Sequence, residues 1–186
     1  MYAVYVYDGP FEKGEAGWPL IRAAAARYGQ ELELQEDFYQ AEIEREEKGK
    51  PYFSHIPLAF SLSHSGLLWL CMFGDKPCGI DLQIMKETKY EDIAKRQFHP
   101  DEQRYVALWG IDGFYEIWVR KEAFCKCTGQ GIFSETPSMV TEEMDLRQKV
   151  SWLEQEYYFT ELYIADDMKC AACTLEDADV QWRILA

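Results

Sequence analysis

The stretch LAFSLSHSGLLWLCMFGDKPCGIDLQI, residues 58–84, decides which kind of fold the chain can adopt. Two apolar runs are separated by the polar turn SHSG, and a third run, PCGIDLQI (77–84), follows. Polar turn residues between runs of strand-forming residues are typical of hairpins. We therefore predict three consecutive strands that pair as an antiparallel meander.

The segments on either side alternate between strand and helix patterns. Residues 2–7 predict a first strand, and WPLIRAAAARYGQ (18–30) predicts a helix with Pro19 in its first turn and Gly29 past its end. The charged EIEREEKGKP (42–51) is typical of a solvated linker. Helices are expected over 90–98, 99–110 and 113–128, the last ended by Gly129, followed by two long strands around the ADD turn at 165–167. This order indicates an α+β fold with two halves, 1–90 and 91–186, each containing helix and a small antiparallel sheet.

The charge of the chain argues against several classes of partner. Its 186 residues carry 19 Lys and Arg against 33 Asp and Glu, and the net charge of −14 opposes binding to nucleic acid or to an anionic membrane. The first residues lack the pattern of a signal peptide, and no apolar run reaches the length of a membrane span. We expect a cytoplasmic monomer in which any phosphate ligand meets a local cluster of cations.

Six cysteines, at positions 71, 78, 125, 127, 170 and 173, allow two interpretations. The pairs in CKC and CAAC are compatible with a zinc or redox site. Each cysteine, however, lies in an apolar segment without the Gly-rich knuckle or His partners of a metal site. This context favours reduced, buried thiols.

Asp81 stands in the middle of the third predicted strand, between two apolar residues, and its position needs an explanation. Gln83 lies two residues further and points to the same face, so the strand directs two oxygen ligands to one spot. An unpaired buried carboxylate is costly, and a hard cation is one compensation. The alternative is an Asp at an exposed strand end that bonds backbone amides or a Lys.

A second set of charged residues lies on the predicted helix 113–128. Glu122 and Lys126 are four residues apart and share one face, beside an apolar side that includes Trp118. Such a pair is usually surface decoration worth about 0.2–0.5 kcal/mol. Here the following turn, TGQGI, would let the helix end approach a ligand closely. Together with Lys121, the pair has the composition of one metal-bridging carboxylate between two phosphate-binding ammonium groups.

The SHSG turn adds two polar side chains, Ser63 and His64. They are sequence neighbours that point to opposite faces of a strand, which disfavours a Ser–His nucleophile pair. They fit better as hydrogen-bond donors to phosphate oxygens.

Five segments resemble, in their order and spacing, the motifs of one enzyme family. They are GKPYF (49–53), FSLSHSG (60–66), CGIDLQ (78–83), IAKRQF (93–98) and WVRKEAFCKCTGQGI (118–132). They are similar to the motifs of 4′-phosphopantetheinyl transferases of the surfactin-synthetase-activating type, approximately G-K-P, F-N-x-S-H-S, G-[IV]-D-[IV]-E and W-x-x-K-E-[AS]-x-x-K. The similarity covers about residues 45–133.

The resemblance implies a fold, an activity and a metal site. The fold would be two similar α+β halves in a pseudo-twofold arrangement, with coenzyme A and Mg²⁺ in the cleft between them. The activity would be transfer of the phosphopantetheine arm of coenzyme A to a serine of an acyl or peptidyl carrier protein, with release of adenosine 3′,5′-bisphosphate. Asp81 and Glu122 match metal-binding carboxylates, Lys126 matches a cation that faces the pyrophosphate, and Glu122 is the implied general base.

The same resemblance implies contacts along coenzyme A. Ser63, His64 and Lys50 match phosphate-contacting positions, with His64 at the 3′-phosphate. Lys121 is a lower-ranked candidate for binding coenzyme A and equally a candidate supporting residue. Larger family members carry an additional basic segment near the nucleotide. In this chain Lys13 and Arg22 are expected to take its place.

Two features leave an alternative open. Family members commonly carry Glu where this chain has Gln83, so this candidate metal ligand lacks a charge and Mg²⁺ should bind more weakly. With the short segment before the first helix, this is compatible with a non-catalytic module that binds coenzyme A or a carrier. The carrier is expected to dock on residues 86–98, where an ordinary surface helix is the alternative interpretation. This region contains Lys89, Ile93, Lys95, Arg96 and Phe98.

Overall fold

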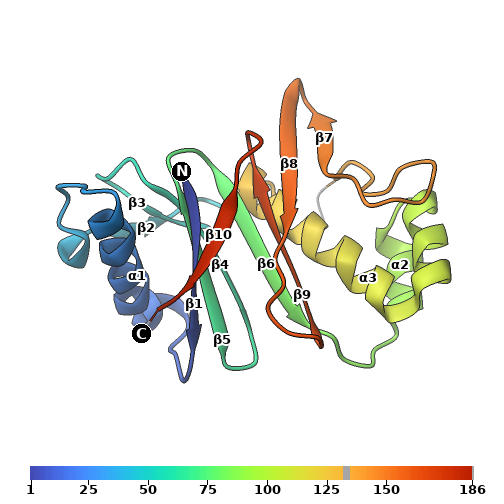
Figure 1. Ribbon diagram of the computed structural model, residues 1–186, viewed down its shortest axis with the longest axis horizontal. Coiled ribbons are helices and arrows are strands. Elements are labelled where there is room, and N and C mark those ends of the chain that lie inside the picture. Colours follow the sequence, from blue (N-terminus) through green and yellow to red (C-terminus); the bar gives the residue numbers. More distant parts are fainter. Residues whose placement is uncertain (132–134, 186) are drawn as a thin grey trace.

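The computed structural model describes residues 1–131 and 135–185, so Ile132, the last residue of the fifth motif, lies outside the described part. Two four-stranded sheets lie side by side, each with helices packed on its outer face (Figure 1). The elements up to the first hairpins are β1 (Tyr2–Asp8), η1 (Gly14–Gly17), α1 (Trp18–Glu31), η2 (Phe38–Gln40), β2 (Ile43–Arg45), β3 (Pro51–Phe53), β4 (Ala59–Ser65) and β5 (Leu68–Gly74). Those that follow are β6 (Cys78–Ile84), α2 (Tyr90–Gln97), α3 (Pro100–Thr128), β7 (Lys149–Trp152), β8 (Gln155–Glu161), β9 (Met168–Thr174) and β10 (Val180–Ile184).

The first sheet has the order β10-β1-β5-β4. The predicted hairpin is confirmed, because β4 and β5 pair antiparallel around Gly66, whose φ of 61° suits a residue without a side chain. The predicted first strand is β1, which pairs antiparallel with β5 on one side. On its other side β1 pairs in parallel with β10, a strand that the sequence did not predict.

The second sheet has the order β6-β9-β8-β7, which makes the predicted meander wrong. Both edges of β5 are already occupied, by β4 and by β1, so β6 cannot pair with β5. It pairs instead with β9, with Asp81 opposite Ala171. The two long strands around the ADD turn are confirmed as β8 and β9, and β7 is an additional short strand before them.

Three serines join the two sheets where β4 lies beside β6. The hydroxyls of Ser61, Ser63 and Ser65 accept the backbone N–H groups of residues 80, 82 and 84 at 3.1, 3.0 and 3.0 Å. These bonds satisfy the backbone donors at the edge of β6, which burial would otherwise leave without water. We call the three residues the serine ladder. It fixes β6 next to the strand that carries Ser63 and His64.

The helices match the predicted ones except at two places. The helix α1 runs through Gly29 to Glu31, because the missing side chain makes room for Phe38, whose Cε2 atom would lie 2.3 Å from a Cβ at this position. The two helices predicted between 99 and 128 are two arms of α3, joined by a sharp kink at Gly110. His99 caps the first arm, and Gly129, with φ of 72°, ends the second as predicted.

The segment 42–51 is not a solvated linker. Its two ends form the hairpin of β2 and β3, in which Glu44 pairs with Tyr52 and Gly49 adopts a φ of 85°. The alternation of charged and apolar residues in this segment is too short to indicate strands. The buried residues that anchor the hairpin, Ile43 and Phe53, lie at its ends.

Three buried clusters hold the layers together. One packs α1 on the outer face of the first sheet, one packs α2 and α3 on the second sheet, and the third joins the inner faces of the two sheets. All six cysteines are buried and unbridged, which confirms the expectation of buried thiols.

The expected division into two halves at residue 90 stays a prediction. One strand from each half, however, belongs to the sheet of the other half. The strand β6 belongs to the sheet of the C-terminal half, and β10 belongs to the sheet of the N-terminal half. Within the described residues, none of the helices is long and apolar enough to span a membrane.

Candidate active site

The site begins at a close approach between β6 and the second arm of α3. A Cβ atom at Gly79 would lie 1.9 Å from the carbonyl oxygen of Ala123 and 2.7 Å from the amide nitrogen of Cys127. Only a residue without a side chain lets the helix lie this close to the strand. The approach brings Asp81, two residues further along β6, beside Lys126 on the helix.

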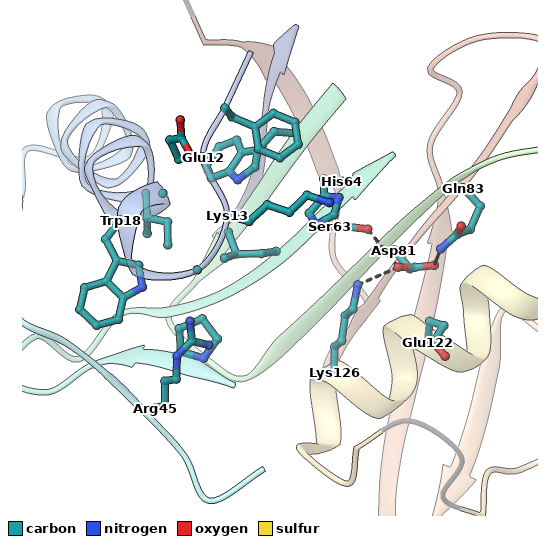
Figure 2. Close-up of a pocket in the computed structure, with 17 residues that line it drawn as sticks. Glu12, Lys13, Trp18, Arg45, Ser63, His64, Asp81, Gln83, Glu122 and Lys126 are labelled. Atoms are coloured by element: carbon teal, nitrogen blue, oxygen red, sulfur yellow. Dashed lines mark hydrogen bonds and ion pairs between the residues drawn. The ribbon is translucent and has the colours of Figure 1, made fainter. Parts of the chain in front are cut away.

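Asp81 is buried and has three partners. Its Oδ1 atom accepts hydrogen bonds from Lys126 Nζ at 2.7 Å and Ser63 Oγ at 3.0 Å, and its Oδ2 atom accepts one from Gln83 Nε2 at 3.0 Å (Figure 2). Lys126 therefore compensates the charge of Asp81 in the protein without a metal ion. The Lys of the alternative interpretation is present, but the carboxylate is only 3% exposed and does not lie at an exposed strand end. The strand pattern could not reveal Lys126, because the two residues lie on different elements.

Glu122 lies one helical turn before Lys126 and lines the same pocket. Among the described residues no hydrogen-bond donor or salt-bridge partner reaches its carboxylate. Burial, and after it the charge of Asp81, raise the pKa of Glu122 from its ordinary 4.5 to about 7, although Lys126 partly opposes both. The site therefore holds one carboxylate that the protein neutralises and a second that it does not.

This pair of carboxylates fits Mg²⁺. Within residues 1–131 and 135–185, no group of three or more His, Cys, Asp or Glu side chains could hold a metal ion. Mg²⁺, however, is commonly bound by one or two protein carboxylates while substrate phosphates and waters complete its octahedron. Asp81 and Glu122 would supply the oxygens, and the uncompensated charge of Glu122 is what a cation would neutralise. Gln83 could add an amide oxygen only if its side chain turned, because it now donates to Asp81.

The pocket has a volume of about 420 Å³ and extends from these carboxylates toward the N-terminal elements. His64 and Lys13 follow next, and the Lys13 side chain extends toward His64 (Figure 2). Burial lowers the pKa of His64 from its ordinary 6.5, and the ammonium groups of Lys13 and Lys126 lower it further. Three basic groups thus face one region of the pocket, which favours an anionic ligand there.

The far end of the pocket contains residues that the sequence reasoning missed. Trp18 and Arg45 line it (Figure 2). Phe11 lines the same pocket, with its ring 5.3 Å from that of His64. Arg45 was hidden in the segment taken for a linker, and Trp18 was assigned only to the start of a helix. The signal that could have found Arg45 is its position four residues before the G-K-P motif.

Three predicted ligand-binding residues lie outside this pocket. Arg22 Nε donates to the carbonyl oxygen of Ala41 at 2.9 Å. Lys50 Nζ donates to the carbonyl oxygen of Lys126 at 2.6 Å and lines a neighbouring, mostly apolar pocket of about 390 Å³. The Nζ atom of Lys121, on the helix side away from Asp81, forms a buried salt bridge with Glu102 at 2.9 Å. The other predicted residues, Lys13, Ser63, His64, Asp81, Gln83, Glu122 and Lys126, all line the first pocket.

Comparison with known proteins agrees with these features. A family model described as the 4′-phosphopantetheinyl transferase superfamily matches residues 77–173, just over half of the chain. A 4′-phosphopantetheinyl transferase of Bacillus subtilis is 39% identical over 99 residues, which are 47% of this chain and 41% of that protein. The transferase Sfp of Bacillus subtilis strain 168 is 34% identical over 118 residues, covering 61% of this chain and 50% of the relative.

A third relative, the transferase HetI of Nostoc, is 34% identical over 129 residues, or 61% of this chain and 54% of the relative. The chain spans about half the length of the curated relatives it matches. The matched region contains β6 and the second arm of α3, which together carry the carboxylates and Lys126. By this match the chain belongs to the 4′-phosphopantetheinyl transferase superfamily.

Proposed function

We propose that this protein transfers the 4′-phosphopantetheine arm of coenzyme A to a serine hydroxyl of an acyl or peptidyl carrier protein. The observation that carries the proposal is the cluster of Asp81, Glu122 and Lys126 at the end of a pocket whose other lining residues suit a phosphorylated nucleotide. Membership of the superfamily supports it. A cytoplasmic monomer remains part of the proposal.

The transfer would depend mainly on positioning and on neutralising charge, as in other phosphoryl transfers. Lys126 would face the pyrophosphate; its ammonium lies 2.7 Å from Asp81, and both residues line the pocket. Asp81 and Glu122 would hold Mg²⁺, and the bound ion would neutralise further charge on the pyrophosphate. Ser63 orients Asp81 from the other side.

Glu122 is the proposed general base. The oxygen of the carrier serine forms the new bond to the phosphorus that bears pantetheine, and the bond from that phosphorus to adenosine 3′,5′-bisphosphate breaks. The serine proton must be accepted, and Glu122 lines the pocket without a bonded partner; without metal its pKa is raised to about 7, whereas bound Mg²⁺ would lower it. Among the described residues, Glu122 is the carboxylate of the pocket that lies beside Asp81 and has no bonded partner.

The opposite end of the pocket would bind the nucleotide. Lys13 and His64 suit the 3′-phosphate, and Arg45 and Trp18 are new candidates for contacts to the adenosine. Arg22 and Lys50 remain predictions without a place in this pocket; Lys50 is better placed for the pantetheine side, near Lys126.

The carrier would dock beside α2. Lys86, Lys89, Lys95 and Arg96 are exposed there, beside the exposed acidic residues Glu87, Glu91 and Asp92. Phe98 cannot take part as expected, because it is 6% exposed and its ring stacks on Phe114 in the core.

Intact-mass spectrometry of apo carrier proteins, incubated with this protein, coenzyme A and Mg²⁺, tests the proposal. We expect a mass gain of one phosphopantetheine arm that is lost with EDTA and with Glu122→Ala. The exposed carboxylate Glu176, which pairs with Lys76, provides the matched control, and Glu176→Ala should retain full transfer. A carrier with its acceptor Ser changed to Ala should gain no mass.

One observation keeps a second candidate in view. Gln83 donates its amide to Asp81 and so occupies an oxygen that a metal would use. This arrangement suits a module that binds coenzyme A and transfers nothing. Measurable coenzyme A binding without a mass gain on any carrier of the panel would favour it over the transferase.

A further inference from the structure

A second buried ion pair lies on α3, outside the candidate active site. The carboxylate of Glu102 is fully buried, and its Oε2 atom lies 2.9 Å from Lys121 Nζ. Lys121 also donates to Thr136 Oγ1 at 2.7 Å, and its ammonium lies 5.6 Å from the centre of the Phe98 ring. The Lys121 ammonium is thus surrounded by the protein's own groups.

The kink at Gly110 makes this pair possible. Along a straight helix, Glu102 and Lys121 would be separated by about 28 Å, at ~1.5 Å per residue. Gly110 adopts φ of 61° and ψ of −138°, which turns the second arm of α3 back along the first. Tyr105 supports the same bend, because its hydroxyl donates to Glu116 Oε2 at 2.8 Å across the kink.

The same carboxylate fixes a third segment, residues 136–139. Glu102 Oε1 accepts the backbone N–H of Met139 at 2.9 Å, and Oε2 accepts that of His99 at 2.8 Å. His99 Nε2 in turn lies 2.7 Å from the carbonyl oxygen of Thr136. One buried carboxylate therefore holds the start of α3, its second arm and the segment that follows it. We call Glu102 and Lys121, with these contacts, the helix clamp.

The clamp forms the wall behind Glu122. Lys121 and Glu122 are consecutive, so any shift of Lys121 along or around the helix moves Glu122 as well. Phe98, Thr136 and Glu122 also line one small cavity of about 40 Å³. The side of Glu122 that faces away from Asp81 is thus bounded by residues that the clamp holds in place.

We propose that Glu102, acting through Lys121, is a positioning residue for Glu122. Lys121 serves as the counter-ion of Glu102 and does not bind coenzyme A. This inference rests on the proposed function for its effect on turnover. It differs from the expectation drawn from the residue composition of this helix, in which Lys121 is a phosphate-binding group. The two assignments predict opposite consequences for coenzyme A affinity.

Three variants separate them: Glu102→Gln, Lys121→Met and the double variant. If the clamp positions Glu122, each single change lowers kcat about 10–100-fold, the loss expected when a reacting group is misplaced by about 1 Å. The Kd for coenzyme A, measured by calorimetry, stays within about threefold of wild type. The double variant, which leaves no unpaired buried charge, is no slower than either single variant.

The phosphate-binding assignment predicts the reverse. Lys121→Met would then raise the Kd for coenzyme A at least tenfold, and Glu102→Gln would free the ammonium and leave kcat unchanged or tighten binding. Either result overturns the proposal. The exposed pair of Lys76 and Glu176 supplies matched controls, because Glu176→Gln and Lys76→Met should change neither constant.

Folding is checked separately. Should Glu102→Gln fail to fold, Thr136→Val removes only the hydrogen bond to Lys121 and should lower kcat several-fold with an unchanged Kd; an unchanged kcat would count against the proposal. Amide exchange at Met139 and His99 is measured in the ligand-free protein and should accelerate in Glu102→Gln or, if that variant does not fold, in Thr136→Val. If wild type transfers nothing, the proposed function fails, while exchange and the Kd values still decide the clamp.

Discussion

Two lysines on the second arm of α3 each neutralise a buried carboxylate, but on different sides of the helix. Lys126 faces the pocket, where its side chain is 28% exposed and its partner Asp81 lies beside Glu122. Lys121 faces the interior, with 11% of its side chain exposed and its partner Glu102 fully covered. The difference teaches that local chemistry does not set the role of a lysine. What matters is whether a ligand can reach its ammonium.

Breaking the pair of Lys126 and Asp81 should have the largest effect. Lys126→Met removes a cation from the expected pyrophosphate position, and we expect transfer to fall by about 10²–10³-fold. It also leaves Asp81 buried without its counter-ion, which should cost about 3 kcal/mol of unfolding free energy. Urea unfolding and the carrier mass assay measure the two losses.

The double variant Asp81→Asn/Lys126→Met sharpens this result. It should recover most of the stability, since no unpaired charge remains, but none of the transfer. A single Lys126→Met variant as stable as wild type would show that other groups compensate Asp81.

Straightening the kink should break the interior pair alone. Gly110→Ala places a side chain at a φ of 61°, which should cost about 2 kcal/mol and weaken the contact of Glu102 with Lys121. We expect a roughly tenfold lower kcat with coenzyme A affinity unchanged. Ala107→Gly, on the exposed side of the same arm, is the control: it should cost about 1 kcal/mol of helix propensity without changing kcat.

The carboxylate between the two lysines should oppose folding at neutral pH. The pKa of Glu122 is raised to about 7 in the folded chain against 4.5 for an ordinary Glu, so the folded state favours the protonated form. Its contribution to stability is complete below pH 4.5 and is lost as the pH rises through about 7. Because Glu122 is partly exposed, we expect Glu122→Gln to gain only about 1–2 kcal/mol at pH 8.

Urea unfolding in EDTA between pH 5 and pH 8 measures this gain. The difference between Glu122→Gln and wild type should shrink toward pH 5. Adding Mg²⁺ should also reduce it, because a bound cation stabilises the charged wild-type site. A difference that does not change with pH would contradict the assigned pKa.

The smallest effect is expected at Gln83. Gln83→Glu restores the charge common in related motifs and replaces a donor to Asp81 with a third carboxylate. We expect the Mg²⁺ concentration for half-maximal transfer to fall about threefold, while the rate at saturating Mg²⁺ changes little. A variant that needs as much Mg²⁺ as wild type would remove Gln83 from the metal site.

Much of the site could be read from the sequence because its residues follow local patterns. Asp81 and Gln83 share a face by the twofold period of a strand, and Glu122 and Lys126 share one by the period of a helix. Arg45 escaped notice because a short hairpin of charged residues has the same composition as a linker. Trp18 escaped because a tryptophan at a helix start is compatible with the core as well as with a pocket.

The sheet order was mispredicted for a comparable reason. The strand pattern of residues 58–84 correctly placed three strands, but a strand carries no local mark of its neighbour. The serine ladder illustrates this: Ser61, Ser63 and Ser65 look like polar alternation on an exposed face, and yet two of them are buried against β6.

By itself the sequence determined the α+β class, the end of α3 at Gly129, and which carboxylates and lysine share a face of a strand or a helix. These depend on periodicity and on end signals within a few residues of one another. Only the tertiary structure decided which partner each charged group meets, Lys126 for Asp81 and Glu102 for Lys121. It also decided that β6 pairs with β9. Such pairings join residues far apart in the chain and depend on which edges and faces are already occupied, so no local pattern encodes them.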